Sequence, residues 1–191
     1  IQNEGIDGTL KSLIDRAGAT AVTISPYVME PAGEDTGTRE PPIDAGAGKV
    51  RLLDRPLWGK RELFCRTAPS FAHDMRLFKG MRYQPAEPTE LTRKQGPRIA
   101  DFIREAKRRG LRVYFQVQAA IPPGYRVQFG GPKDGDRPLL RDGTAPKSRL
   151  SNNGSLASPE IRKYVFALIR DLFRVYPDID GIRLDWPEYP P

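Results

Sequence analysis

The residues best suited to catalysis or binding lie in the last segment of the chain, DGIRLDWPEYPP at positions 180–191. Ile182 and Leu184 alternate there with Arg183 and Asp185. A strand with this pattern would bury one face and present two opposite charges on the other. Because a buried charge is costly unless it is paired or used, the two charges indicate either a functional site or a paired charge layer inside the fold.

Aromatic rings and a second carboxylate follow directly, as Trp186, Glu188 and Tyr189 among three prolines. Two carboxylates can share the acid, base and nucleophile roles of glycosidic bond cleavage, and aromatic rings can lie against a sugar. We therefore take Asp185 as candidate nucleophile or charge stabiliser and Glu188 as candidate acid/base. Arg183 would hold Asp185 ionised, since a nearby cation lowers a carboxyl pKa. Trp186 and Tyr189 are candidate substrate-binding residues.

Amide side chains stand at two further places that could contribute to such a site. The segment LRVYFQVQ at 111–118 alternates strictly, with Val, Phe and Val on one face and Tyr, Gln and Gln on the other. Gln116 and Gln118 can donate and accept hydrogen bonds, which favours a binding site over an ordinary polar sheet face without excluding the latter. Asn152 and Asn153 precede the last helix and are further candidates, although asparagine in a turn needs no ligand.

The elements that would position these residues alternate along the chain. Apolar residues at three and four residue steps predict helices, and β-branched or alternating runs predict strands between them. In order, these are a helix at 9–17, a strand at 19–25, a helix at 97–109, a strand at 111–118, a helix at 159–173 and the final strand. This order predicts right-handed crossovers and a parallel sheet, in which ligands bind at the carboxyl ends of the strands.

Two irregular connections separate these elements, at 28–96 and 119–150. Both are rich in proline and glycine, and the first shows only short strand-like runs near 62–67 and 81–83. Connections of this length are unusual in a compact domain and are commonly functional loops. A structural cover over an open barrel end would explain them equally well.

Length and hydropathy predict one globular domain over residues 1–191. The chain is 38% hydrophobic, which suffices for a sizeable core, and it contains no apolar run near the roughly 18 residues of a membrane span. It begins with Ile1 and stops inside the candidate site, so we expect the protein to continue beyond both ends. A signal peptide before Ile1 would make it secreted or periplasmic. The oligomeric state stays open.

Charge and cysteine content narrow the function classes. The net charge of +7 permits binding to a polyanion. The densest basic run, at 104–112, alternates with acidic residues and lacks interleaved aromatics, so we interpret it as a solvated helix face and expect no nucleic acid partner. The single cysteine, Cys65, excludes an internal disulfide and a cysteine metal cluster. We interpret Cys65 as a small buried residue rather than a nucleophile.

The carboxyl-terminal half also resembles a known group of enzymes. The stretch SPEIRKYVFALIRDLFRVYPDIDGIRLDWPEYPP, preceded by AKRRGLRVYFQV, is similar to the first half of the bacterial glycoside-hydrolase-like TIM barrels. The likeness covers residues 97–191. The final strand also resembles the corresponding strands of the family 18 chitinases and the α-amylase family. The resemblance implies an α/β fold, a parallel (β/α)8 TIM barrel of which this chain holds the first half.

The same resemblance implies hydrolysis of O-glycosidic bonds in an oligo- or polysaccharide. We expect no cofactor and assign no residue to a metal, and the sequence leaves metal dependence open. Two departures leave the mechanism open. Arg183 replaces the middle aspartate of the chitinase strand and Pro187 precedes Glu188, while the strand at 113–118 lacks the aspartate and the Asn-His pair of the amylase family. A non-catalytic carbohydrate-binding barrel and a basic polyanion-binding module are the alternatives.

Overall fold

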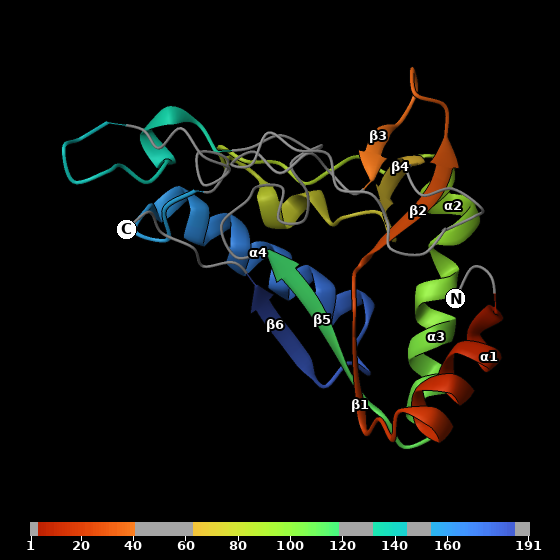
Figure 1. Cartoon of the computed structure of the whole chain (residues 1–191). Helices are drawn as coiled ribbons and strands as arrows, with labels where there is room; N and C mark the ends of the chain where they lie inside the picture. Colours follow the sequence, from red (N-terminus) through yellow and green to blue (C-terminus); the bar gives the residue numbers. More distant parts are fainter. Residues whose placement is uncertain (1–3, 41–62, 119–131, 145–153, 186–191) are drawn as a thin grey trace.

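A computed structural model describes residues 4–40, 63–118, 132–144 and 154–185, which form two small sheets with helices around them (Figure 1). The larger helices lie beside a parallel sheet, and the second sheet is antiparallel. Among the described helices, none is both long and apolar enough to cross a membrane.

The parallel sheet has the strand order β1-β5-β6, with β1 at Ala21–Ile24, β5 at Arg112–Gln118 and β6 at Gly181–Asp185. Both neighbouring pairs run parallel, as the alternation of helices and strands predicted. Between β1 and β5, Val22 pairs with Val113, and between β5 and β6, Gln118 pairs with Asp185. The three strands therefore point their carboxyl ends toward one edge of the sheet.

The helices that cover this sheet are α3 at Pro97–Arg108 and α4 at Pro159–Val175. Each begins with proline, whose fixed φ and missing N–H suit the first helical position. The Ser158 side chain caps α4 by accepting hydrogen bonds from the backbone N–H groups of Glu160 and Ile161. Gly110 follows α3 with φ +80°, a left-handed conformation that glycine adopts readily.

A third helix, α1 at Gly5–Lys11, continues as a π-helical turn at Ser12–Arg16 and contacts α3. Leu10 on α1 is fully buried, and Arg109 after α3 forms an ion pair with Asp7. The helix predicted at 9–17 therefore exists, and it starts one turn earlier than its apolar stripe indicated.

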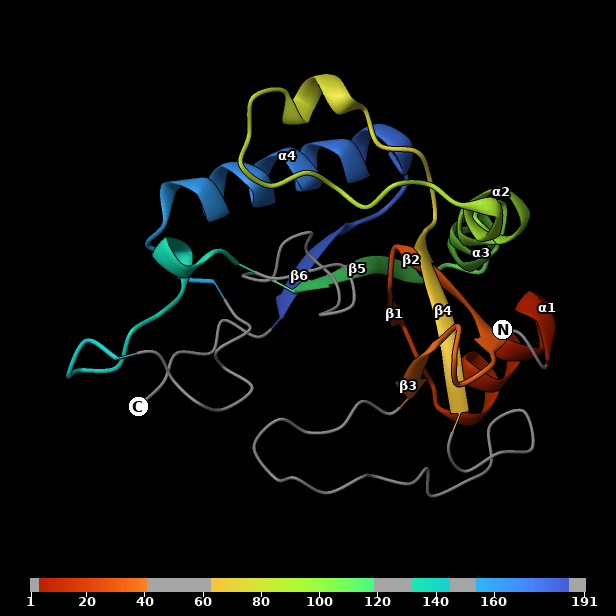
Figure 2. The same cartoon turned by 90° about the horizontal axis from the view of Figure 1, so that it is seen from above.

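The core lies between the apolar face of the parallel sheet and these helices. Its central residues on β5 are Val113, Phe115 and Val117, all 0% exposed. Opposing them are Phe102 and Ile103 on α3 and a row of residues on α4, namely Ile161, Leu168 and Leu172. Figure 2 shows α4 lying along β5 and β6. Phe173, the last residue of the helix predicted at 159–173, is 40% exposed.

The connection predicted as irregular over 28–96 contains a second sheet. Its strands are β2 at Tyr27–Ala32, β3 at Thr38–Glu40 and β4 at Leu63–Pro69, in the order β2-β4-β3. All pairs in it are antiparallel. The short helix α2 at Glu90–Gln95 packs against β2 and β4. Of the two strand-like runs seen in the sequence, the one near 62–67 is β4 and the one at 81–83 forms no strand.

The prediction of a parallel (β/α)8 barrel was wrong. After β1 the chain does not enter a helix and return as a second parallel strand. It turns at Pro26 into β2 and builds an antiparallel sheet, so β1 pairs next with β5, which comes much later in the sequence. Three parallel strands with a separate antiparallel sheet form a mixed α/β arrangement, and within the described ranges no closed barrel exists.

Residues 70–89 run back over α4, with a 3-10 helix at Met75–Phe78 against it (Figure 2). This places α4 between the parallel sheet and the 3-10 helix. Tyr164 of α4 packs against the rings of Phe78 and Tyr83 from this segment, Asp171 of α4 contacts His73, and both are 0% exposed.

Candidate functional site

The predicted site residues of β5 and β6 lie on one face of the parallel sheet. Side chains of paired residues in neighbouring strands point to the same face, and the face alternates along each strand. Gln116 pairs with Arg183, and Gln118 pairs with Asp185. The side chains of Gln116, Gln118 and Arg183 therefore share the face opposite Val113, Phe115 and Val117, which contact the helices. We call this surface the polar face, and it also includes Tyr114 and Thr23, which pair with one another.

Burial along the strands follows this division. The apolar residues of β5 are fully buried, whereas Gln116 and Gln118 are half-buried and Arg183 is exposed. Thr23 on β1 is also exposed. The helices therefore cover one face of the sheet, and the polar face keeps access to solvent at several positions. A ligand could reach it without disturbing the core.

Two buried oxygens at the carboxyl edge of the sheet lack a hydrogen-bond partner among the described residues. They are Oγ of Ser25, directly after β1, and Oε1 of Gln118, the last residue of β5. An unsatisfied buried oxygen costs free energy, and such groups gather where a ligand or water completes the bonding. Gln116, by contrast, has an interaction within the protein.

Tyr114 belongs to the polar face and was absent from the predicted site. Its ring lies over Gly181 of the neighbouring strand, where a Cβ atom would come within 3.2 Å of ring carbon Cδ1. The glycine therefore makes room for the tyrosine ring, which is half-buried beside the Gln116–Arg183 pair. The strict alternation of 111–118 already placed Tyr114 on the same face as the glutamines, so the sequence alone could have predicted it as a site residue.

Of the other predicted site residues, only Asp185 lies within the described part of the chain. Asp185 is the last residue of β6, and its backbone position is fixed by its pairing with Gln118. Trp186, Glu188 and Tyr189 lie outside the described residues, as do the two loop asparagines Asn152 and Asn153. The structure therefore brings together Gln116, Gln118, Arg183 and the backbone of Asp185.

A second polar cluster joins the 70–89 segment to α4. His73 Nδ1 lies 2.8 Å from Asp171 Oδ2, and both side chains are nearly fully buried. The same carboxylate oxygen accepts the backbone N–H of Asp74, and its other oxygen accepts Nε of Arg174. Burial lowers the pKa of His73, and the cation of Arg174 acts in the same direction, against the hydrogen bond and charge of Asp171.

His73 lies in the connection predicted as irregular over 28–96, and it is packed between the rings of Phe71 and Phe78. The partner Asp171 is 98 residues away in sequence. Since all the described polar contacts of Asp171 belong to the protein itself, we interpret this pair as a structural attachment of the 3-10 helix to α4.

Asp136 forms a third cluster, at the start of α4. Its carboxylate accepts hydrogen bonds from Ser158, Tyr83 and Arg82, at 2.6, 2.5 and 2.7 Å. Burial opposes ionisation of Asp136, but these three donors outweigh it and lower the pKa of the carboxyl group. Because Ser158 is the N-cap of α4, Asp136 stabilises the beginning of that helix, and its oxygens are used within the protein.

The basic run at 104–112 is largely neutralised by ion pairs. Arg104 pairs with Asp101, while Arg108 and Arg109 both pair with Glu105. Lys107 pairs with Asp180 at 2.7 Å. A stripe that binds phosphates needs free cations, so these pairs favour the interpretation as a solvated helix face.

The described part of the chain offers little support for a cysteine nucleophile or a metal site. Cys65 on β4 is 1% exposed, and burial raises the pKa of its thiol to about 11. A thiol with such a pKa is a poor nucleophile at neutral pH. The described residues contain no group of three or more His, Cys, Asp or Glu side chains arranged to hold a metal ion.

Comparison with known proteins gave no match: no family model, no curated protein and no solved structure is similar to this chain.

Proposed function

We propose that the polar face of the parallel sheet binds a carbohydrate and that the protein hydrolyses its glycosidic bonds. The observation that carries this proposal is the parallel register of β5 and β6, which aligns Gln116 with Arg183 and Gln118 with Asp185 on one face. Sugars are bound by side chains that both donate and accept hydrogen bonds and by aromatic rings. The glutamines supply the first, and the ring of Tyr114 supplies the second.

The proposed chemistry uses two carboxylates. Asp185 acts as nucleophile or charge stabiliser, and Arg183, two residues before it on the same face, favours its ionised form. Glu188 acts as acid and base. A retaining mechanism needs carboxyl groups roughly 5 to 5.5 Å apart, and an inverting one needs about 6.5 to 9.5 Å. Trp186 and Tyr189 complete the sugar contacts, with Asn152 and Asn153 from the preceding loop.

The test uses two isosteric variants, Asp185→Asn and Glu188→Gln. Hydrolysis is measured as the release of reducing ends from a panel of neutral and acidic polysaccharides. Affinity is measured as retardation in native gels that contain the same polysaccharide. We expect each variant to lose about 10²- to 10⁴-fold in kcat, the range of acid–base catalysis, while the retardation persists. Asp178→Asn, an exposed carboxylate before β6, is the matched control and should leave both unchanged.

A carbohydrate-binding protein without catalysis is the second candidate, favoured by Tyr114 and by the Gln118 oxygen that has no hydrogen-bond partner within the described ranges. It predicts retardation with no release of reducing ends from any substrate, a result that contradicts hydrolysis. Gln118→Leu would then weaken the retardation, and Asp185→Asn would not. Binding to dextran sulfate that falls steeply with salt and is insensitive to Gln118→Leu would instead indicate a polyanion-binding protein.

A further inference from the structure

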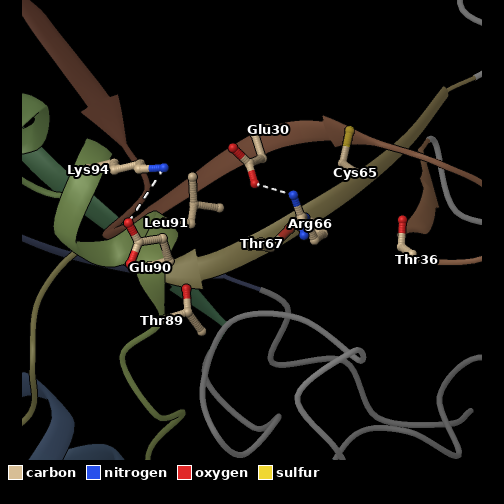
Figure 3. Close-up of a pocket in the computed structure, with 10 residues that line it drawn as sticks. Glu30, Thr36, Cys65, Arg66, Thr67, Thr89, Glu90, Leu91 and Lys94 are labelled. Atoms are coloured by element: carbon tan, nitrogen blue, oxygen red, sulfur yellow. Dashed lines mark ion pairs between the residues drawn. The ribbon is translucent and has the colours of Figure 1, made fainter.

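A pocket of about 530 Å³ opens between the antiparallel sheet and α2 (Figure 3). It belongs to a different sheet from the polar face and plays no part in the proposed hydrolysis. Its volume lies within the range of pockets that hold small molecules. Residues from β2, β4 and α2 line it, and the ones that carry the argument are Glu30, Arg66, Glu90, Leu91 and Lys94.

Two ion pairs supply the charge of this pocket. Arg66 contacts Glu30 across the β2–β4 pair at 2.8 Å, and Lys94 contacts Glu90 one turn away on α2 at 3.5 Å. Figure 3 shows the two pairs on either side of Leu91. Each pair has one cation and one anion, so the four lining charges balance. A ligand with a single charge would meet attraction and repulsion of similar size, whereas a zwitterion can satisfy both signs.

The Glu30–Arg66 pair is the better anchor for such a ligand. Glu30 is 28% exposed, against 60% for Glu90, so its charge is less screened by water. The guanidinium of Arg66 has five N–H donors in a planar fork, and a carboxylate can occupy two of them. Exposed ion pairs contribute little to stability, so a ligand can insert between the partners at little cost to the fold.

One neighbouring side chain extends the match beyond charge. Leu91 lines the pocket between the two ion pairs and offers an apolar contact. A charged pair beside an apolar group suits a small ligand that carries both kinds of group.

We propose that this pocket binds a free α-amino acid with an apolar side chain. The carboxylate of the ligand binds the fork of Arg66, its ammonium group binds Glu30, and its side chain lies against Leu91. The four charges then alternate in sign, and the apolar part of the ligand leaves water. Glu90 and Lys94 form a more exposed rim of the pocket and contribute less to the affinity for the ligand.

The experiment compares three ligands of nearly equal size by isothermal titration calorimetry with the whole chain. Leucine carries both charges, 4-methylpentanoate lacks the ammonium group, and 3-methylbutylamine lacks the carboxylate. We expect leucine to bind at least tenfold more tightly than either of the others. Equal affinity for all three ligands, or no heat from leucine up to ten millimolar, would overturn the proposal.

Variants locate the binding. Arg66→Gln and Glu30→Gln should each weaken leucine binding at least tenfold, and Arg66→Lys should weaken it less because it keeps the charge without the fork. Glu90→Gln makes the same change of charge on the rim and should weaken it less than threefold. Arg76→Gln, in an exposed ion pair with Asp74, is the control outside the pocket. Leucine binding that persists unchanged in both Arg66→Gln and Glu30→Gln contradicts the assigned site. Circular dichroism melting identifies a variant that fails to fold. If Arg66→Gln fails to fold, Arg66→Lys replaces it, and unchanged leucine affinity in Arg66→Lys then contradicts the assigned site.

Discussion

The two sheets of this protein differ in how fully their side chains are buried. In the parallel sheet, Val113, Phe115 and Val117 are 0% exposed and contact helices. In the antiparallel sheet, Val28 and Ala68 join the same core, but the cross-strand pair of Glu30 and Arg66 has side chains 28% and 59% exposed. Apolar burial stabilises by roughly 25 cal/mol per Å², while exposed ion pairs contribute about 0 to 1 kcal/mol. Most of the stability should therefore reside in the parallel sheet and its helices.

The difference also bears on function. A sheet with one face in a packed core can present polar groups on the other face at fixed positions, because the core fixes the strands. Gln116, Gln118 and Arg183 are such groups. The antiparallel sheet presents one charged pair, Glu30 with Arg66, that a ligand can separate with little loss of stability. The first arrangement suits chemistry that needs fixed geometry, and the second suits reversible binding.

The largest expected effect is the loss of unfolding free energy when a core residue of the parallel sheet is truncated. Phe115→Ala removes a fully buried ring that packs edge-on against Tyr176 at 5.1 Å between ring centroids. We expect a loss of about 3 to 5 kcal/mol in the free energy of unfolding, the usual cost of such a cavity. Urea denaturation followed by circular dichroism measures it. A loss below 1 kcal/mol would contradict the assignment of Phe115 to the main core.

The next effect concerns the attachment of the 3-10 helix to α4. Because burial lowers the pKa of His73 below its ordinary 6.5, the folded state binds fewer protons than the unfolded state in this range. Stability should be full above pH 6.5 and should fall as the pH drops from 6.5 toward the folded pKa, at up to about 1.4 kcal/mol per pH unit.

Unfolding free energies measured between pH 8 and pH 5 test this. His73 is the single histidine of the chain, so its titration dominates this window. His73→Asn can keep a hydrogen bond to Asp171 and removes the titrating ring, and the decline near pH 6 should disappear in this variant. An unchanged decline would show that another group is responsible.

The smallest expected effect comes from the antiparallel sheet. Glu30→Gln removes one charge of an exposed pair, and we expect a change of at most about 1 kcal/mol in the unfolding free energy. The same urea titration measures it beside Phe115→Ala. A loss as large as that of Phe115→Ala would remove the distinction between the two sheets.

Local patterns in the sequence predicted the elements around the parallel sheet. The apolar stripes of α3 and α4 follow from residues three and four apart, and the alternation of β5 follows from successive residues on opposite faces. Pro97, Pro159 and Gly110 marked helix ends through their own backbone preferences. These signals act over a few residues, so they hold in whatever fold surrounds them.

Local sequence signals for β2 and β3 were much weaker. Pro31 interrupts β2, which an edge strand tolerates because its outer N–H positions need no partner. Their pairing with β4 joins residues far apart in the chain, such as Glu30 and Arg66, and no local pattern reveals such a pairing. The barrel prediction failed for this reason, since alternating helices and strands do not specify how many strands join one sheet.

By itself, the sequence determined where the helices α3 and α4 and the strand β5 form and which face of each is apolar, because those properties depend on neighbours within one or two turns. Only the tertiary structure decided that Gln118 stands opposite Asp185, that Tyr114 lies over Gly181 and that His73 is buried against Asp171. These contacts join residues far apart in the chain, and the packing of the whole core selects them.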